Sequence, residues 1–175
     1  DTVAGTTTRV SVATDGTQSN DHSYSPTISA DGRYVSFHSL ASNLVPGDTN
    51  GTNDVFVRDT VAGTTTRVSV ATDGTQGDGH SYGSAVSGDG RYVAFVSGAS
   101  NLVAGDTNGW GDVFVRDTVA GTTTRVSVAS DGTQGGYGGG GSTPAVSGDG
   151  RYVAFASSSS NLVAGDTNGR DDVFV

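Results

Sequence analysis

One segment occurs three times in this sequence, and this repetition limits the possible folds more than any other feature. Each copy opens on the pattern Ser-x-Asp-Gly-Arg-Tyr-Val, and successive copies lie about 58 and about 60 residues apart. The copies are Ser29–Asp59, Ser87–Asp117 and Ser147–Val175. Repeats of this length are typical of solenoids and propellers, in which each unit buries its apolar surface against its neighbours. We therefore expect one module of three repeats, with the bounds 1–58, 59–116 and 117–175.

The composition favours strands over helices. All 9 basic residues are Arg, all 18 acidic residues are Asp, and the chain has no Met or Cys. Good helix formers are therefore scarce, whereas Val, Thr, Tyr and Phe, which suit a half-buried pleated surface, are plentiful. The sequence predicts an all-β chain.

Apolar and polar residues alternate along short segments bounded by turn signals. Within Tyr34–Ser39, Val35 and Phe37 fall on one face of the expected strand and Ser36 on the other. An Asp-Gly turn precedes this segment. Strands are expected at Thr6–Ala13, Thr27–Ser29, Tyr34–Ser39 and Asp54–Arg58. Four such strands per repeat predict one antiparallel sheet, with large side chains packed against small ones of the next sheet. The phenylalanines expected to be buried between sheets are Phe37, Phe95 and Phe155.

Three motifs together carry a family resemblance: DGRYVAF, DVFVRD and TTTRVSV. The chain resembles, over nearly its whole length, the TolB-like family of WD-like repeats in periplasmic and secreted bacterial proteins. The resemblance implies a β-propeller in which the Ser-x-Asp-Gly turn joins the innermost strand to the second strand. It implies a periplasmic or secreted location, but no particular reaction.

The order of strands along the chain suggests how a ring could be completed. The chain starts in a fourth strand, contains two complete blades at about 26–71 and 84–129, and stops in a third strand. It thus supplies three blade equivalents, whereas propellers typically have four to eight blades. We expect two chains to exchange their first strand and form a six-bladed ring; a nine-bladed trimer is the alternative. We interpret the chain as a processed, trimmed or designed segment.

The GDTNG segment of each repeat is a candidate metal site. In calcium loops, oxygen ligands alternate along the chain and a glycine provides a sharp turn. The residues at ligand positions are Asp48, Asn50, Asp54, Asp106, Asn108, Asp112, Asp166, Asn168 and Asp172. The acid expected at the first position is replaced by Pro46, Ala104 and Ala164. An Asx-turn, in which these side chains bond the local backbone, is therefore the alternative to calcium.

The repeats differ from one another mainly in two sets of loops, which a propeller places on one face. Loops on a rigid scaffold commonly carry binding residues. The candidate contact residues on this face are His22, His80, Trp110, Tyr137 and Arg170. The alternative is sequence drift in loops without a ligand.

The charge pattern narrows the possible partners. A net charge of −9 argues against nucleic acid and anionic membranes, which both attract basic surfaces. The arginines of TTTRVSV (Arg9, Arg67 and Arg125) are expected to pair with nearby Asp or to lie on the surface. No residue pair suggests glycosidase chemistry. We therefore expect a non-enzymatic scaffold or binding module for a protein or carbohydrate, or, alternatively, a purely structural or designed repeat protein.

Overall fold

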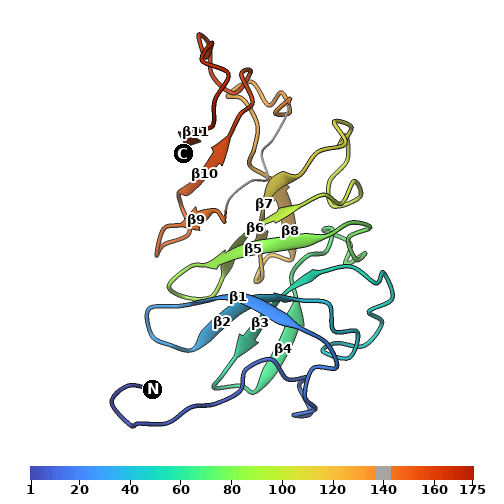
Figure 1. Cartoon of the computed structure of the whole chain (residues 1–175), viewed down its shortest axis with the longest axis vertical. Coiled ribbons are helices and arrows are strands. Elements are labelled where there is room, and N and C mark those ends of the chain that lie inside the picture. Colours follow the sequence, from blue (N-terminus) through green and yellow to red (C-terminus); the bar gives the residue numbers. More distant parts are fainter. Residues whose placement is uncertain (137–142) are drawn as a thin grey trace.

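The computed structural model describes residues 1–136 and 143–175, which form three stacked antiparallel sheets (Figure 1). The first sheet contains β1 (Ser23–Ile28), β2 (Tyr34–Ser39), β3 (Asp54–Asp59) and β4 (Thr64–Arg67). The second contains β5 (Ser81–Val86), β6 (Tyr92–Ser97), β7 (Asp112–Asp117) and β8 (Thr122–Arg125). The third contains β9 (Ala145–Val146), β10 (Val153–Ser157) and β11 (Asp172–Phe174). No helix occurs among the described residues, and so none there is long and apolar enough to cross a membrane.

Each sheet is a meander in which consecutive strands pair. The orders β1-β2-β3-β4 and β5-β6-β7-β8 confirm the four-stranded sheets predicted for complete repeats. The second and third strands pair in the same register in every sheet: Phe37 lies opposite Phe56, and Phe95 lies opposite Phe114. In the described part of the third repeat, β10 pairs with β9 and β11, and the far edge of β11 has no partner strand.

The first strand of the blade is longer than the sequence predicted. We expected Thr27–Ser29, whereas β1 begins at Ser23 and ends at Ile28. Its register against β2 shifts between Tyr24 and Thr27, and Ser25 in this irregularity has a φ of 49°. A bulge accommodates Pro26, which cannot donate a ladder hydrogen bond. The proline hid the strand because it interrupts the alternating pattern.

The prediction of a strand over Thr6–Ala13 was wrong for the chain on its own. This segment makes only an isolated bridge between Val12 and Gln18. Its counterpart β4 is a strand because β4 pairs with β3. Among the described residues, no strand pairs with Thr6–Ala13, and a strand without a neighbour leaves its backbone hydrogen bonds unmade.

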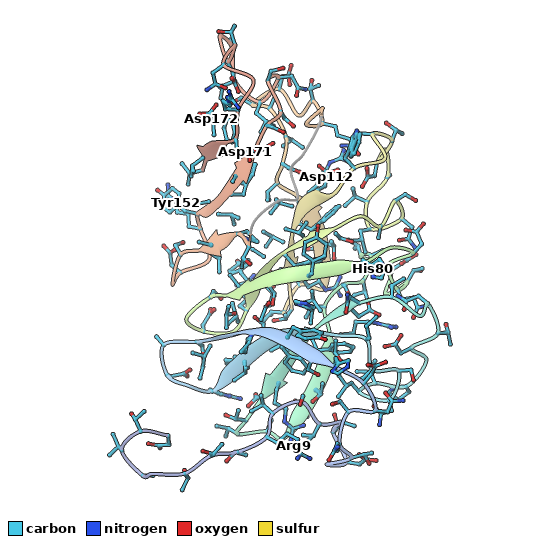
Figure 2. All side chains as sticks on the ribbon, in the orientation of Figure 1. Arg9, His80, Asp112, Tyr152, Asp171 and Asp172 are labelled. Atoms are coloured by element: carbon cyan, nitrogen blue, oxygen red, sulfur yellow. The ribbon has the colours of Figure 1, made fainter. Side chains whose placement is uncertain are left out.

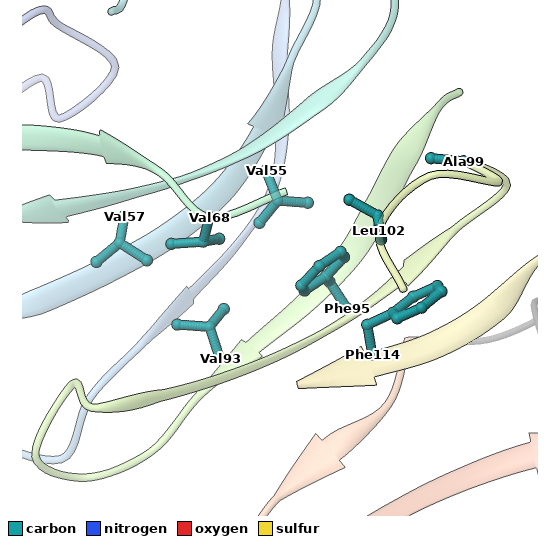
Figure 3. Close-up of a cluster of buried hydrophobic side chains, with 8 residues drawn as sticks. All are labelled: Val55, Val57, Val68, Val93, Phe95, Ala99, Leu102 and Phe114. Carbon is teal, nitrogen blue, oxygen red and sulfur yellow. The ribbon is translucent and has the colours of Figure 1, made fainter. Parts of the chain in front are cut away.

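The main apolar core lies between the first two sheets (Figure 3). The first sheet and the segment after it contribute three valines, and the second sheet and its loop contribute five residues. The cluster comprises Val55, Val57, Val68, Val93, Phe95, Ala99, Leu102 and Phe114. As predicted, Phe95 and Phe155 are buried against the neighbouring sheet, whereas Phe37 is buried in a separate cluster made only of residues of its own repeat and not between sheets. A valine layer from one sheet thus covers the phenylalanine face of the next.

Small residues let the sheets approach closely at their first strands. The Ser84 Oγ on β5 donates a hydrogen bond of 3.0 Å to the Ser36 Oγ on β2. The turn glycine Gly90, at φ 75°, lies against the Tyr34 ring, and a side-chain Cβ there would overlap the ring. The third sheet repeats this contact with Gly150 and Tyr92. These contacts set the stacking of the three sheets.

An arginine–aspartate pair joins the two turns at one end of each complete sheet, which we call the turn face. Arg33 donates to Asp59 through Nε (3.0 Å) and Nη2 (2.7 Å). Asp59 Oδ1 also accepts backbone N–H bonds from Val61 and Ala62, both at 2.9 Å. The guanidinium also lies over the Tyr34 ring. The turn face is therefore held by side chains as well as by backbone.

We expect the pH dependence of an Arg33→Gln variant to reveal this pair. Hydrogen bonding from Arg33, aided by the backbone of Ala62 and Val61, lowers the pKa of Asp59 from 3.8 to about 2. Since the folded pKa lies below the unfolded one, the stabilisation is present above about pH 4 and is lost as the pH falls towards 2. Urea denaturation should show a wild-type advantage at neutral pH that shrinks through this window. An Arg170→Gln control should show no such change, and an advantage independent of pH would contradict the pairing.

Candidate functional site

The loops between the second and third strands and the loops between sheets share one end of the molecule, which we call the loop face. Several hydrogen bonds join loop 40–53 to loop 68–80, and three of them involve the end of each loop. Asn50 Nδ2 donates to Gly77 O (2.9 Å), and Thr52 Oγ1 donates to Gly79 O (3.4 Å). The Asn53 N–H donates to His80 Nδ1 (3.0 Å). These contacts place both variable loop types on one face, as the propeller interpretation required.

The GDTNG segment of the first repeat contacts Arg67, at the end of β4, and Ser69, just after it. We call this group of polar side chains the first cluster. The Arg67 guanidinium lies between two carboxylates: Nη1 is 3.2 Å from Asp48 Oδ1 and 3.2 Å from Asp54 Oδ2. Ser69 Oγ donates to Asp54 Oδ1, and Asn50 Nδ2 donates to Asp54 Oδ2 (3.1 Å). Asp54 is 0% exposed. Its charge is therefore buried and fully hydrogen-bonded, which is what burial of a carboxylate requires.

The second repeat builds an equivalent second cluster. Arg125 Nη1 lies 3.3 Å from Asp106 Oδ1 and 3.5 Å from Asp112 Oδ2. Ser127 Oγ donates to Asp112 Oδ1, as Ser69 does to its aspartate in the first cluster. Gln134 Nε2 adds bonds to Asp106 (2.9 Å) and to Asp112 (3.2 Å). The expected pairing of Arg67 and Arg125 with nearby Asp is confirmed. The serines were not foreseen, because nothing in an alternating strand pattern marks them.

The GDTNG segment of the third repeat has the carboxylates, but among the described residues no arginine pairs with them. Asn168 Nδ2 donates to Asp172 Oδ2 at 2.8 Å, as in the other clusters. Among the described residues, neither Asp166 nor Asp172 has an ion-pair partner. Asp172 is also only half-buried, whereas Asp54 and Asp112 are buried. The third cluster is therefore an incomplete copy of the other two.

Burial disfavours the charged form of Asp48 in the first cluster and of Asp106 in the second cluster. The pKa of Asp48 is raised by burial and then by the nearby charge of Asp54, and the Arg67 charge opposes this rise. The pKa of Asp106 is raised in the same way, by burial and by Asp112. Each complete cluster holds two carboxylates around one guanidinium. The single arginine is therefore the charge on which the cluster depends.

The calcium hypothesis assigned these oxygens to a metal ion. In the first cluster, the Arg67 guanidinium supplies the positive charge next to Asp48 and Asp54. Asn50 aims its NH₂ group at Asp54, and its Oδ1 accepts the Thr52 N–H (3.1 Å), which is the Asx-turn alternative. The same turn recurs at Asn108 and Asn168. A calcium ion would have to displace the guanidinium and rotate the amide.

We therefore expect the melting temperature to be the same with millimolar calcium and with a chelator. In the first two clusters the guanidinium already neutralises part of the carboxylate charge, and in the third cluster Asn168 directs its NH₂ group at Asp172, so the folded state gains little from the ion. Thermal melts followed by circular dichroism would measure this. A rise in melting temperature that saturates with calcium and disappears in Asp54→Asn would establish calcium binding instead.

The candidate contact residues come from different blades, and Figure 2 labels one of them, His80, which directly precedes β5. His22 and His80 precede β1 and β5, whereas Trp110 and Arg170 precede β7 and β11. The Trp110 side chain is 47% exposed, and the other three residues are also exposed. Tyr137 lies outside the described residues. The structure thus spreads the four described residues along one face and does not gather them into a single pocket.

Sequence reasoning missed a row of rings in the first blade. The rings of His22 and Tyr24 stack with centroids 5.7 Å apart, and Tyr24 lies 5.7 Å from His38. Burial lowers the pKa of His38. Only the β1–β2 register shows the contact, because it places Tyr24 opposite His38. The row places two further rings, Tyr24 and His38, next to the candidate contact residue His22.

Comparison with known proteins gives a match in structure only. No protein-family profile matches the sequence, and no curated protein matches it significantly. A putative TolB from Agrobacterium tumefaciens aligns with a TM-score of 0.51 and 20% identity, over 78% of this chain and 38% of that one. TolB from Acinetobacter baumannii aligns with a TM-score of 0.51 and 18% identity, over 87% of this chain and 29% of that one.

Both alignments cover less than two fifths of the TolB chains, so they bear on the blades and not on a whole protein. A prolyl endopeptidase aligns with a TM-score of 0.48 and 17% identity, over 87% of this chain and 22% of its own, and supports no statement about activity. Identities this low establish the fold alone. The chain therefore has the β-propeller fold seen in TolB structures, as its repeat motifs indicated.

Proposed function

We propose that this chain is a non-enzymatic β-propeller module that binds a protein or carbohydrate through its loop face. The single observation that carries the proposal is the contrast between the two faces. The turn face repeats the same ion pair, Arg33–Asp59 and then Arg91–Asp117. The loop face instead presents Thr52, Trp110 and Arg170 at one repeat position, with Trp110 exposed. Variation confined to one end of a rigid scaffold favours recognition there.

The buried polar groups support a structural role over catalysis. Both oxygens of Asp54 accept hydrogen bonds, from Ser69 and from Asn50 and Arg67. Asp112 is saturated in the same way. A carboxylate whose oxygens are all occupied is poorly placed to act as a base or nucleophile.

We further propose that two copies of the chain complete a six-bladed ring, with a nine-bladed trimer as the alternative. The three stacked sheets described for one chain support this, because propellers typically contain four to eight blades. Light scattering should give a solution mass of twice the 17.5 kDa of one chain, or three times that mass for the trimer. On the family resemblance, we place the module in the periplasm or outside the cell.

Binding by the loop face can be tested with immobilised glycans and an array of secreted bacterial proteins. Trp110 is the only tryptophan, so its fluorescence should change when a ligand identified on the arrays is titrated. We expect Trp110→Ala and His80→Ala to weaken that binding. The matched control is Val119→Ser, an exposed change on the turn face that should leave binding unaltered.

Two results would favour the alternative of a purely structural or designed repeat module. One is that wild-type protein binds nothing on either array. The other is that Val119→Ser weakens every observed interaction as much as Trp110→Ala does, because recognition would then not reside in the loops.

A further inference from the structure

We propose that a neutral saccharide binds at the loop face between the first two sheets, where unsatisfied polar side chains meet a row of aromatic rings. The residues of this site, which we call the histidine site, are His22, Tyr24, His38, Asn53 and His80. The inference rests on the loop-face binding proposed above and narrows its ligand to a carbohydrate. Both sheets are complete four-stranded meanders, so one chain holds the whole site.

His38 stands where the other repeats have an apolar residue. Its counterparts are Val96 and Ala156, and Val96 is 0% exposed in the core between the second and third sheets. His38 faces the second sheet, because Ser36, two residues earlier on β2, is hydrogen-bonded to Ser84 of β5. His38 Nδ1 is nevertheless buried without a hydrogen-bond partner among the described residues. The first repeat thus replaces apolar packing by a polar atom that the protein does not satisfy.

Asn53 provides a second unsatisfied atom near His38. It lies two residues before the β3 residue that pairs with His38, and such diagonal neighbours lie within reach of long side chains. Its backbone is fixed to the second repeat: the N–H donates to His80 Nδ1 (3.0 Å), and the C=O accepts the Ser81 N–H (2.8 Å). Asn53 Oδ1 is buried, with no partner in the part of the chain that the structure describes. The second repeat has Gly111 here and so carries no such atom.

These two atoms are unusual within the molecule. Buried polar atoms without partners are few in folded proteins, and each calls for a physical reason. The others in residues 1–136 and 143–175 are Nε of Arg67 and Nε of Arg125, which occupy the same position in both complete repeats. The shared architecture of the blades therefore accounts for the arginine atoms. It does not account for His38 and Asn53, which differ from their counterparts in both other repeats.

Aromatic rings lie next to the unsatisfied atoms. The Tyr24 ring has its centroid 5.7 Å from that of His38 on one side and 5.7 Å from that of His22 on the other. Tyr24 is 48% exposed, and Tyr82, its counterpart on β5 between two sheets, is 37% exposed. Exposure of this ring is therefore a property of the blade, whatever its place in the stack. An exposed aromatic face offers apolar contact to the C–H face of a sugar ring.

His80 adds a hydrogen-bond donor. Because its Nδ1 accepts the Asn53 N–H, the neutral imidazole carries its hydrogen on Nε2. The side chain is exposed and directly precedes β5 (Figure 2), so this N–H is accessible to a ligand. Burial lowers the pKa of His38, which keeps that imidazole neutral as well. The site thus combines uncharged donors and acceptors.

This combination fits a neutral saccharide better than an ion. A hydroxyl group both donates and accepts, so it can satisfy Asn53 Oδ1 and, in either tautomer, His38 Nδ1. The histidine site has no arginine or lysine to attract an anion, and the net charge of −9 repels one. The three histidines are not arranged for a metal either, because no group of three His, Asp or Glu among the described residues could hold one.

Replacing His38 by valine tests the site, because valine is the residue that the second repeat has there. The probes are the neutral hexasaccharides maltohexaose, cellohexaose and N-acetylchitohexaose, titrated calorimetrically. We expect wild type to bind at least one of them and His38→Val to bind it about tenfold more weakly, the effect of one lost hydrogen bond. The melting temperature of His38→Val should equal or exceed that of wild type, because the unsatisfied atom is gone. A purely structural histidine would instead give a lower melting temperature and unchanged binding.

The rings are tested with a matched pair of tyrosines. Tyr24→Ala should weaken the same binding by about tenfold or more, because the stacking surface is lost. Tyr152→Ala is the control, since this ring is also exposed but directly precedes β10, away from the histidine site. Equal weakening by both substitutions would contradict the assignment.

The outcomes separate the histidine site from the loop-face function on which it rests. If wild type binds none of the three hexasaccharides but binds a protein on the array, the saccharide site is refuted and loop-face binding stands. If Trp110→Ala weakens hexasaccharide binding while His38→Val and Tyr24→Ala do not, sugars bind elsewhere on the loop face and the histidine site is again refuted. If neither the titrations nor the arrays show binding, both proposals fail.

Discussion

Replacing Phe95 by alanine is expected to lower the free energy of unfolding by about 3–5 kcal/mol. Phe95 is 0% exposed and lies in the main core, where its ring stacks on Phe114 with centroids 5.9 Å apart (Figure 3). Val55 and Val57 cover it from the neighbouring sheet. The substitution would remove a ring that two sheets share, and the paired strands around it cannot close the resulting cavity. Urea denaturation would measure the loss.

The matched control for this prediction is Val119→Ala, at an exposed position that should change stability by less than about 0.5 kcal/mol. A loss below about 1 kcal/mol for Phe95→Ala would contradict the packing between the first two sheets. Phe114→Ala should have a similar effect, because the two rings occupy one cluster.

Replacing Arg67 by methionine is expected to cost about 3–5 kcal/mol of stability, as is usual when one partner of a buried ion pair is removed. The change would leave the carboxylates of Asp48 and Asp54 together without a cation, and Asp54 cannot reach water. Methionine retains most of the apolar stem, so the loss would report on charge more than on packing. Urea denaturation at neutral pH would measure it.

Two further variants make the Arg67 prediction specific. Arg170→Met, in an exposed loop, should leave stability nearly unchanged. Adding Asp54→Asn to Arg67→Met should restore part of the loss, because the buried charge disappears while the hydrogen bond with Ser69 can persist. An Arg67→Met variant as stable as Arg170→Met would show that the cluster does not depend on its guanidinium.

Much of the fold can be read from local pattern, because strands and tight turns depend on neighbouring residues. The alternation in Tyr34–Ser39 predicted β2 to the residue, and the Asp-Gly signal predicted the turn before it. The bulged β1 escaped this reasoning, because Pro26 breaks the alternation and only pairing with β2 shows that the strand continues.

The candidate site was predictable only in part, because its members lie in different segments. GDTNG stood out as a cluster of oxygen ligands, and the arginines of TTTRVSV were expected to pair with a nearby Asp or to lie on the surface. The sequence could not show that Ser69 completes the cluster, since that contact depends on how the segment after β4 folds back onto Asp54.

The sequence by itself determined the repeat, the all-β class and the alternation that buries one phenylalanine per unit, because these features follow from residue spacing along the chain. Only the tertiary structure decided whether a segment with strand character becomes a strand. Thr64–Arg67 lies beside β3 and pairs with it, whereas Thr6–Arg9 has the same four residues but no neighbouring strand in the described part of the chain. The reason is physical: a strand is stabilised by hydrogen bonds to another strand, and that partner is a property of the assembled fold.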